Sequence, residues 1–454
     1  MISINPATEK TIGELKEFTE EQIFEIVKKA RQSSWKNLDI KEKTRIIQEI
    51  IPLIQKNKDK IATLITKETG KPIKQSRHEI DMTISRIQFY VNNVPEYLKP
   101  EILYDYEKET NIIRFDPLGI IVVISPWNAP FFLSLVNIIP ALLAGNSVIV
   151  KPSEYTSFIG LEINNLFEIL KEKRFPENTF FTVIGSKDIG RKLVSSDIDM
   201  VSFTGSIIGG KSVMKNSADR LHKIILELGG KDPAIVLEDV DIRSTVADIV
   251  KAAIMNTGQV CCSIERVYVL ERIYDNFVKE VVSNIKQVNI GDPLNENTDM
   301  GPFTMELQLN KVIDHVKDAV NKGAKILIGG KRIKRKGYFF EPTVITNVDH
   351  SMKIMKEETF GPIIPIMKVY SIEEAVKLAN DSLYGLTASV WTRDLEMGKE
   401  IAKQINAGTV SINRHGTSKA GCPWGGCKQS GIGRIYSKEG IREFTNIKHV
   451  WVIK

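Results

Sequence analysis

Ile120-Ile121-Val122-Val123-Ile124-Ser125 is a short β-branched run that ends at Pro126-Trp127-Asn128. The same texture returns after helical stretches, in the runs Ser147–Val150, Phe180–Ile184, Met200–Thr204 and Lys223–Leu228. Strands that alternate with helices indicate a parallel sheet with helices on both faces. The sequence therefore predicts a protein of the α/β class.

A second alternating series predicts a second α/β domain. Its strands are expected at Ala234–Leu237, Arg266–Leu270, Lys325–Ile328 and Ile363–Val369, and its helices at residues 244–256, 274–287 and 306–322. Two large domains, joined near Glu227–Lys231, suit a chain of 454 residues, because one hydrophobic core rarely serves such a length. Residues 17–100 show apolar positions every three or four residues, which predicts covering helices, for example over Glu20–Ala30 and Lys41–Gln55.

Bulk composition excludes several classes of protein. Hydrophobic residues make up 42% and charged residues 26%, and no apolar run approaches the roughly 18 residues of a membrane helix. The start Met1-Ile2-Ser3-Ile4-Asn5-Pro6 lacks the features of a secretion signal, so we expect a cytoplasmic protein that does not contact membranes. The net charge of +6 is small and lysines are spread along the chain, which argues against nucleic-acid binding.

The four cysteines are too few for a disulfide framework, so free thiols are expected. A zinc site built from all four would combine neighbouring cysteines with a Cys-x4-Cys spacing, which suits a tetrahedral metal poorly; we expect no metal site. Cys261 is the informative one, because it follows a flexible Gly-Gln turn in Asn256-Thr257-Gly258-Gln259-Val260-Cys261-Cys262. A thiolate there is a strong nucleophile that needs a base, an oxyanion pocket and an electron acceptor. We interpret Cys262 as its buried neighbour.

Polar residues follow the strands of the first series, where open α/β sheets bind ligands. Asn128 can donate its amide to a developing oxyanion or form an Asx turn. Lys151-Pro152-Ser153-Glu154 offers a carboxylate for ribose hydroxyls and a lysine for sugar or phosphate, or else a surface ion pair. Gly205 and Ser206 open a helix after a strand, an arrangement that favours phosphate.

Two further carboxylates are candidates, and one common fingerprint is missing. Glu227, in Glu227-Leu228-Gly229-Gly230-Lys231, is flanked by apolar residues that can raise its pKa for general-base work; alternatively, it is paired with Lys231. Glu358 lies beside Phe360 before a tight turn. The segment from Gly185 to Gly190 retains only spaced glycines, so Gly-x-Gly-x-x-Gly is absent and any nucleotide must bind in another mode.

Taken in order, these motifs resemble the aldehyde dehydrogenase superfamily, from Asn5-Pro6-Ala7-Thr8 to the tail Phe444-Thr445-Asn446-Ile447-Lys448. The resemblance implies NAD(P)-dependent oxidation of an aldehyde to a carboxylic acid. Cys261 resembles the nucleophile, Glu227 the base, and Asn128 the side chain that forms the oxyanion hole with the Cys261 backbone amide. The implied cofactor contacts are Lys151, Ser153 and Glu154 with Trp127, then Gly205 and Ser206 at the pyrophosphate, and Glu358 and Phe360 at the nicotinamide ribose.

The resemblance also implies two Rossmann-like domains and a small β hairpin for oligomerisation. It assigns residues 1–98 and 118–228 to the NAD(P)-binding domain, 229–429 to the catalytic domain, and 99–117 with 443–454 to the oligomerisation arm. A homodimer or homotetramer is expected. Glu154 favours NAD over NADP, because a carboxylate repels a 2′-phosphate.

Departures from the family pattern concern the substrate. Met255 and Val136 stand where enzymes for succinic semialdehyde generally have arginines, and Ala129 replaces a bulky aromatic residue. In relatives, one further loop lines the pocket. In this chain, that loop contains Arg414, His415, Ser418 and Lys419. This mixture predicts a small polar aldehyde such as glyceraldehyde or lactaldehyde, with Arg414 able to rescue an anionic one. Succinate-semialdehyde oxidation, CoA-acylating chemistry, whose enzymes typically lack the Glu227 base, and a catalytically silent binding protein are the alternatives.

Overall fold

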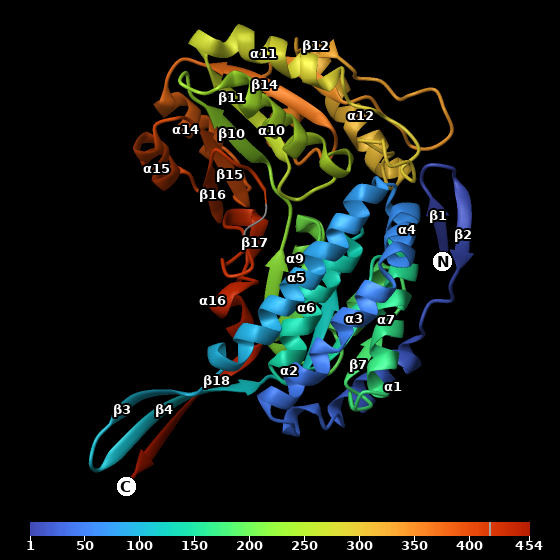
Figure 1. The fold of residues 1–454 in the computed structure, drawn as a ribbon, viewed down its shortest axis with the longest axis vertical. Helices are drawn as coiled ribbons and strands as arrows, with labels where there is room; N and C mark the ends of the chain where they lie inside the picture. Colours follow the sequence, from blue (N-terminus) through green and yellow to red (C-terminus); the bar gives the residue numbers. More distant parts are fainter. Residues whose placement is uncertain (417–418) are drawn as a thin grey trace.

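The computed structural model describes residues 1–416 and 419–454 and contains two large sheets flanked by helices (Figure 1). The six-stranded sheet has the order β17-β9-β8-β5-β6-β7, in which β17 is antiparallel to β9 and the other pairs are parallel. Its strands are β5 (Ile120–Ile124), β6 (Ser147–Lys151), β7 (Phe180–Thr182), β8 (Met200–Thr204), β9 (Lys223–Glu227) and β17 (Gly431–Ile432).

The seven-stranded sheet has the order β12-β13-β14-β11-β10-β15-β16, in which β12 is antiparallel to β13 and the other pairs are parallel. Its strands are β10 (Asp232–Val236), β11 (Ile264–Leu270), β12 (Lys325–Ile328), β13 (Thr343–Thr346), β14 (Ile363–Val369), β15 (Thr387–Trp391) and β16 (Thr409–Ile412). The predicted α/β class is confirmed, although both sheets are mixed because a short antiparallel strand closes one edge of each.

Helices bury both faces of the six-stranded sheet. They are α1 (Glu20–Arg31), α2 (Ile40–Gln48), α3 (Ile50–Lys56), α4 (Lys58–Thr69), α5 (Ile73–Tyr97), α6 (Pro130–Leu143), α7 (Ser157–Lys171), α8 (Lys187–Val194) and α9 (Ile207–Ser217). Along β5, Ile121 and Val123 pack with α2 to α7, whereas Ile120 and Val122 pack with α1, α8 and α9. Every position of this strand is therefore covered, which explains its continuous apolar run.

The prediction of a single helix over Lys41–Gln55 is wrong. Two helices, α2 and α3, meet there at Glu49. Pro52 has no backbone N–H, so it cannot bond to the carbonyl of Gln48, and the helix breaks between them.

The seven-stranded sheet is covered by α10 (Ile242–Ile254) and α11 (Glu271–Ile285) on one face and by α12 (Glu306–Asn321), α14 (Ile372–Asn380) and α15 (Leu395–Gln404) on the other. Outside these two sheets and their covering helices lie β1 (Ile2–Asn5), β2 (Lys10–Glu14), α13 (Lys353–Lys356) and α16 (Ser437–Arg442). Within the described ranges, no helix has both the length and the apolar character needed to cross a membrane.

A three-stranded antiparallel sheet projects from the body of the molecule (Figure 1). It consists of β3 (Glu101–Asp105), β4 (Glu109–Pro117) and β18 (Thr445–Ile453), in the order β18-β4-β3. Thus two segments more than 300 residues apart in the sequence build one extension, since His449 pairs with Ile113.

Candidate active site

Four neighbouring strands of the six-stranded sheet end at the same level. Ile124 of β5 pairs with Phe203 of β8 and Lys151 of β6, and Thr204 pairs with Glu227 of β9. The strand order reverses between β5 and β8, and open α/β sheets bind ligands in the crevice at such a switch point. This edge carries the predicted residues Trp127, Asn128, Lys151, Ser153, Glu154, Gly205, Ser206 and Glu227.

The other sheet supplies the nucleophile loop from its amino ends. Cys261 lies between a 3-10 turn (Met255–Gly258) and β11, and Asn256 and Thr257 adopt left-handed φ values of 51° and 59°. Gln259 is fully buried; its Oε1 accepts a hydrogen bond from the Thr304 amide at 3.0 Å, and its Nε2 donates to the Asn256 carbonyl at 3.0 Å. The Gly-Gln turn predicted to be flexible is therefore held rigidly by its buried side chain.

Asn128 contacts this loop directly. Its Nδ2 donates to the Gln259 carbonyl at 3.1 Å, which fixes the direction of the amide and leaves a second N–H for another acceptor. The Nδ2 of Asn256 bridges the Asn128 and Gln259 carbonyls at 3.0 and 3.2 Å. The Asn128 side chain thus bonds to the loop of Cys261 rather than forming a local Asx turn.

Glu227 is buried at the end of β9, with 5% of its surface exposed. Its Oε1 has no hydrogen-bond partner among the described residues. Burial, followed by the nearby Cys261, raises the pKa of Glu227 well above its usual value, and Arg434 and Trp424 act in the opposite direction. A buried carboxyl with one oxygen unused can accept a proton from a water molecule in the cleft.

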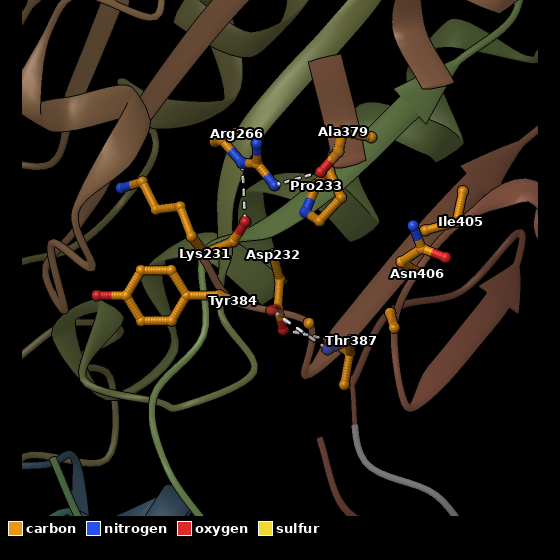
Figure 2. A pocket seen from close by; sticks show the side chains of 11 residues that line it. Lys231, Asp232, Pro233, Arg266, Ala379, Tyr384, Thr387, Ile405 and Asn406 are labelled. Carbon is orange, nitrogen blue, oxygen red and sulfur yellow. Dashed lines mark hydrogen bonds between the residues drawn. The ribbon is translucent and has the colours of Figure 1, made fainter. Parts of the chain in front are cut away.

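The alternative pairing of Glu227 with Lys231 is wrong. The Nζ of Lys231 contacts Glu265 at 2.6 Å and the Thr359 hydroxyl at 2.9 Å, all buried. Arg266 holds the same segment by donating to the Lys231 carbonyl at 2.8 Å and to the Ala379 carbonyl at 2.9 Å (Figure 2). The Lys231 side chain therefore bonds to residues of the second domain, and Glu227 forms no ion pair with Lys231.

The Cys261 thiol is half-buried and lies next to buried Cys262. A hydrogen bond with the Cys262 side chain and burial raise the pKa of Cys261 well above its usual value. The resting side chain is therefore a thiol at neutral pH, and a reaction at Cys261 requires proton removal.

Glu358 and Phe360 reach the cleft through a turn that Glu265 fixes. The carboxylate of Glu265 accepts the Thr359 amide at 2.6 Å and the Phe360 amide at 2.7 Å. The Phe360 ring lies edge-on to Trp127, with 5.4 Å between ring centres. Burial, followed by the charge of Glu265, raises the pKa of Glu358 to about 7.

The residues predicted to hold the adenosine half lie at the end of β6 and at the start of α9. Lys151 is buried and donates to the Pro152 carbonyl at 3.0 Å; burial lowers its pKa, and Glu154 and Glu17 oppose that shift. Ser153 precedes a 3-10 helix (Glu154–Thr156) and accepts a bond from Tyr155. At α9, Ser206 caps the helix by accepting the Gly209 amide at 3.1 Å, so the first-turn amides point to the crevice.

Close backbone approach at two glycines brings these parts together. A Cβ at Gly258, whose φ is +71°, would collide with the Gly361 backbone, and one at Gly230 would lie 2.5 Å from the Cys261 carbonyl. No side chain fits at either position without moving the nucleophile loop or the turn after Phe360.

We expect Gly258→Ala to lower both stability and turnover. Left-handed strain alone is worth about 1 kcal/mol, and the collision with Gly361 must add to it. Gly323→Ala is a matched control, because Gly323 has φ +97° but nothing within 4 Å. Thermal unfolding and kcat measured on both variants should show a larger melting-point loss and a fall in kcat for Gly258→Ala alone; equal effects would contradict the packing argument.

The residues predicted to line the substrate pocket differ in their exposure. Arg414 and Lys419 are exposed, and Ser418 lies outside the described residues. The His415 side chain is only 1% exposed and bonds to the Cys262 carbonyl, so it lies behind the nucleophile rather than in an open pocket. Among the described residues, no group of three or more metal-binding side chains gathers, and Cys427 contacts two backbone carbonyls.

Sequence reasoning missed Arg86. It is 6% exposed on α5, and its guanidinium lies 4.0 Å from the ring centre of Tyr436, which packs 6.5 Å from the Phe132 ring of α6. Burial raises the pKa of Tyr436 well above its usual value, Arg86 opposes that shift, and Glu227 and Cys261 add to it, so Tyr436 connects the buried arginine with the base and the nucleophile. A lone arginine on an amphipathic helix gives no signal of this placement.

Comparison with known proteins decides the family, since residues 1–450 match the model of the aldehyde dehydrogenase family. The chain belongs to this family. It is 35% identical to betaine aldehyde dehydrogenase of Bacillus subtilis (strain 168) over 460 residues, which cover 99% of this chain and 93% of that protein.

Solved structures of aldehyde dehydrogenases match the whole fold. Lactaldehyde dehydrogenase from Escherichia coli has a TM-score of 0.96 and 34% identity, covering 100% of this chain and 95% of its own. Betaine aldehyde dehydrogenase from Staphylococcus aureus in complex with NAD+ has a TM-score of 0.94 and 34% identity, covering 99% and 91%. The predicted class is confirmed: the protein is an NAD(P)-dependent aldehyde dehydrogenase.

Proposed function

We propose that this aldehyde dehydrogenase works through covalent intermediates on Cys261. Cys261 loses its proton to solvent, the thiolate adds to the aldehyde carbon to give a thiohemiacetal, loss of hydride gives a thioester, and water hydrolyses it to the carboxylic acid and the free cysteine. The observation that carries the proposal is the contact of the Asn128 amide with the loop of Cys261 opposite a buried Glu227. CoA-acylating chemistry is disfavoured, because Glu227 provides a base for water.

Each of three groups has a distinct task. The free N–H of Asn128 and the backbone amide of Cys261 stabilise the oxyanion, which such donors do by roughly 3 kcal/mol each. Glu227 takes a proton from the attacking water, and its raised pKa makes it a stronger base than an exposed carboxylate. Both acts require the rigid loop that Gln259 maintains.

The residues at the crevice fit a dinucleotide. Lys151, Ser153 and Glu154 would hold the adenosine ribose, Gly205 and Ser206 the pyrophosphate at the N-terminus of α9, and Glu358 the nicotinamide ribose, with Trp127 and Phe360 as walls. Bound NAD(P) supplies the acceptor for the hydride. We propose that NAD is preferred over NADP, because the Glu154 carboxylate at the ribose position repels a 2′-phosphate.

We propose a small polar, uncharged aldehyde such as lactaldehyde or glyceraldehyde as the substrate. The buried guanidinium of Arg86 lies on the ring of Tyr436, which both Glu227 and Cys261 also influence, and its charge favours polar groups and repels a cation such as the quaternary ammonium of betaine aldehyde. An anionic aldehyde is the second candidate. Met255 and Val136 replace the arginines that would bind its negative charge, but Arg86 offers a positive charge from another element.

A panel of these aldehydes, assayed with NAD and with NADP, tests the substrate class. We expect kcat/KM for lactaldehyde to exceed that for betaine aldehyde by roughly 30-fold, the factor that corresponds to a like-charge repulsion of about 2 kcal/mol between partly buried groups. Arg86→Met should remove most of this preference, and Arg86→Lys, which keeps the charge, should retain it. Faster oxidation of betaine aldehyde by the unaltered enzyme would exclude the proposed substrate class.

We also propose that the projecting sheet is an oligomerisation arm for a homodimer or homotetramer. Its exposed apolar side chains, on β3 and β18, include Ile102, Tyr104, Ile447, Trp451 and Ile453. Such a patch is typical of a protein interface. The four free thiols agree with the proposed cytoplasmic location, where thiols stay reduced.

A further inference from the structure

His415 bonds to the backbone next to the nucleophile. Its Nε2 lies 2.9 Å from the Cys262 carbonyl oxygen, and its side chain is 1% exposed. The two residues are 153 positions apart in the chain, so only the folded protein brings them together.

Its hydrogen bonds determine the tautomer of His415. A carbonyl oxygen can only accept, so Nε2 must carry the proton. Nδ1 then accepts, and the Ser389 hydroxyl, 3.0 Å away, must donate to it. The Ser389 oxygen in turn accepts the indole N–H of Trp391 at 3.0 Å. In this series of hydrogen bonds, from Trp391 on β15 to the Cys262 carbonyl, each group donates to the next one.

The surroundings keep His415 neutral. Its Nε2 lies 4.0 Å from Asp232, whose carboxylate accepts the hydroxyl and the amide of Thr387 (Figure 2). Burial raises the pKa of Asp232 well above its usual value and lowers the pKa of His415 to about 4. At neutral pH a donor on Nε2 is therefore permanently available to the Cys262 carbonyl.

The loop is thus held at two carbonyls that flank Cys261. On one side, Asn128 and Asn256 bond to the Gln259 carbonyl. On the other side, His415 bonds to the Cys262 carbonyl, while the carbonyl of Cys261 itself lies against Gly230. Rotation of either flanking peptide would turn the thiol away from Asn128 and Glu227.

We propose that His415 is a positioning residue: it fixes the Cys262 peptide and so directs the Cys261 thiol into the cleft. The inference rests on the proposed role of Cys261 as nucleophile. His415 touches neither the aldehyde nor the cofactor in this role, and acts through the backbone alone.

The experiment compares His415→Leu with His415→Gln, whose amide nitrogen can replace Nε2 as a donor. We expect His415→Leu to lower both kcat and the rate of Cys261 alkylation by iodoacetamide roughly 10- to 100-fold, because small misplacement of a reacting atom has effects of that size. The KM for the cofactor should stay within about twofold, since uniform binding is untouched. His415→Gln should recover most of both rates.

His350→Leu is the matched control. His350 is also largely buried, between Tyr268 and Asp381, but far from the nucleophile loop in its contacts, so its loss should lower the melting temperature without lowering kcat. Equal impairment in the Leu and Gln variants of His415, or unaltered kcat in His415→Leu, would overturn the proposal. Turnover retained by Cys261→Ala would overturn the proposed function, whereas the alkylation rates, read at the peptide with Cys261, still report on His415.

Discussion

Cys261→Ala is expected to abolish aldehyde-dependent NAD(P)H formation, with a loss on the order of 10⁴-fold or more. Two of the three remaining thiols are engaged elsewhere: Cys262 is 3% exposed inside an apolar cluster, and Cys427 contacts the carbonyls of Gly385 and Asn406. Cofactor binding should persist, because the predicted cofactor residues lie on other elements. Initial rates and a fluorescence titration with NADH measure the two effects separately.

Cys262→Ala is the matched control for this variant. The hydrogen bond that the Cys261 thiol shares with Cys262 is the largest cause that raises the pKa of Cys261, so its removal should lower that pKa. We expect the variant to keep more than about a tenth of kcat and its alkylation at position 261 to begin at lower pH, since the thiolate is the reactive form. Substantial turnover by Cys261→Ala would instead assign the nucleophile to Cys262 or another residue.

The first sheet could be predicted from local sequence because its strands are covered on both faces. Runs such as Ile120–Ile124 contain almost nothing but β-branched residues, and the predicted and observed bounds differ by at most two residues. The level carboxyl ends of β5, β6, β8 and β9 then bring Asn128, Lys151 and Glu227 to one edge, as parallel sheets do.

The second sheet was harder to predict for two physical reasons. Strands β13, β15 and β16 are four or five residues long and mix Thr and Ser with aliphatic residues, so they give neither an apolar run nor a clear alternation. This sheet also faces the cleft with its amino ends, where Cys261 and Asp232 lie, and the rule about carboxyl ends does not apply to them.

The partners of the site residues could not be read from the sequence at all. Glu265, Arg86 and His415 are polar residues whose burial is decided by contacts with distant segments, for example Glu265 with Thr359. Gln259 is a further example. The local sequence predicts a flexible turn, but tertiary packing buries the Gln259 side chain and gives it two hydrogen bonds.

Glu227→Gln is expected to slow deacylation most, with kcat falling roughly 10²- to 10⁴-fold, the usual contribution of a general base. Glutamine keeps the size of the side chain but cannot take the proton of water. A first turnover should still release about one NAD(P)H per active site, followed by slow steady-state release, because the thioester accumulates. Stopped-flow absorbance measures this burst, and hydroxylamine should accelerate turnover by attacking the thioester in place of water.

The pH dependence gives an independent test of the same base. Burial raises the folded-state pKa of Glu227, so the carboxylate that acts as base is lost as pH falls through that raised value, and kcat of the unaltered enzyme should rise with pH. Glu227→Gln should flatten that rise.

The variant should also be at least as stable as the parent, since it removes a buried carboxyl with an oxygen that lacks a partner among the described residues. Unfolding therefore cannot explain its slow turnover. Glu162→Gln on α7 controls for the loss of a buried glutamate, because Glu162 bonds to Lys60 and not to the residues of the site. A steady-state rate unchanged in Glu227→Gln, or a slow rate without a burst, would remove Glu227 as the base for deacylation.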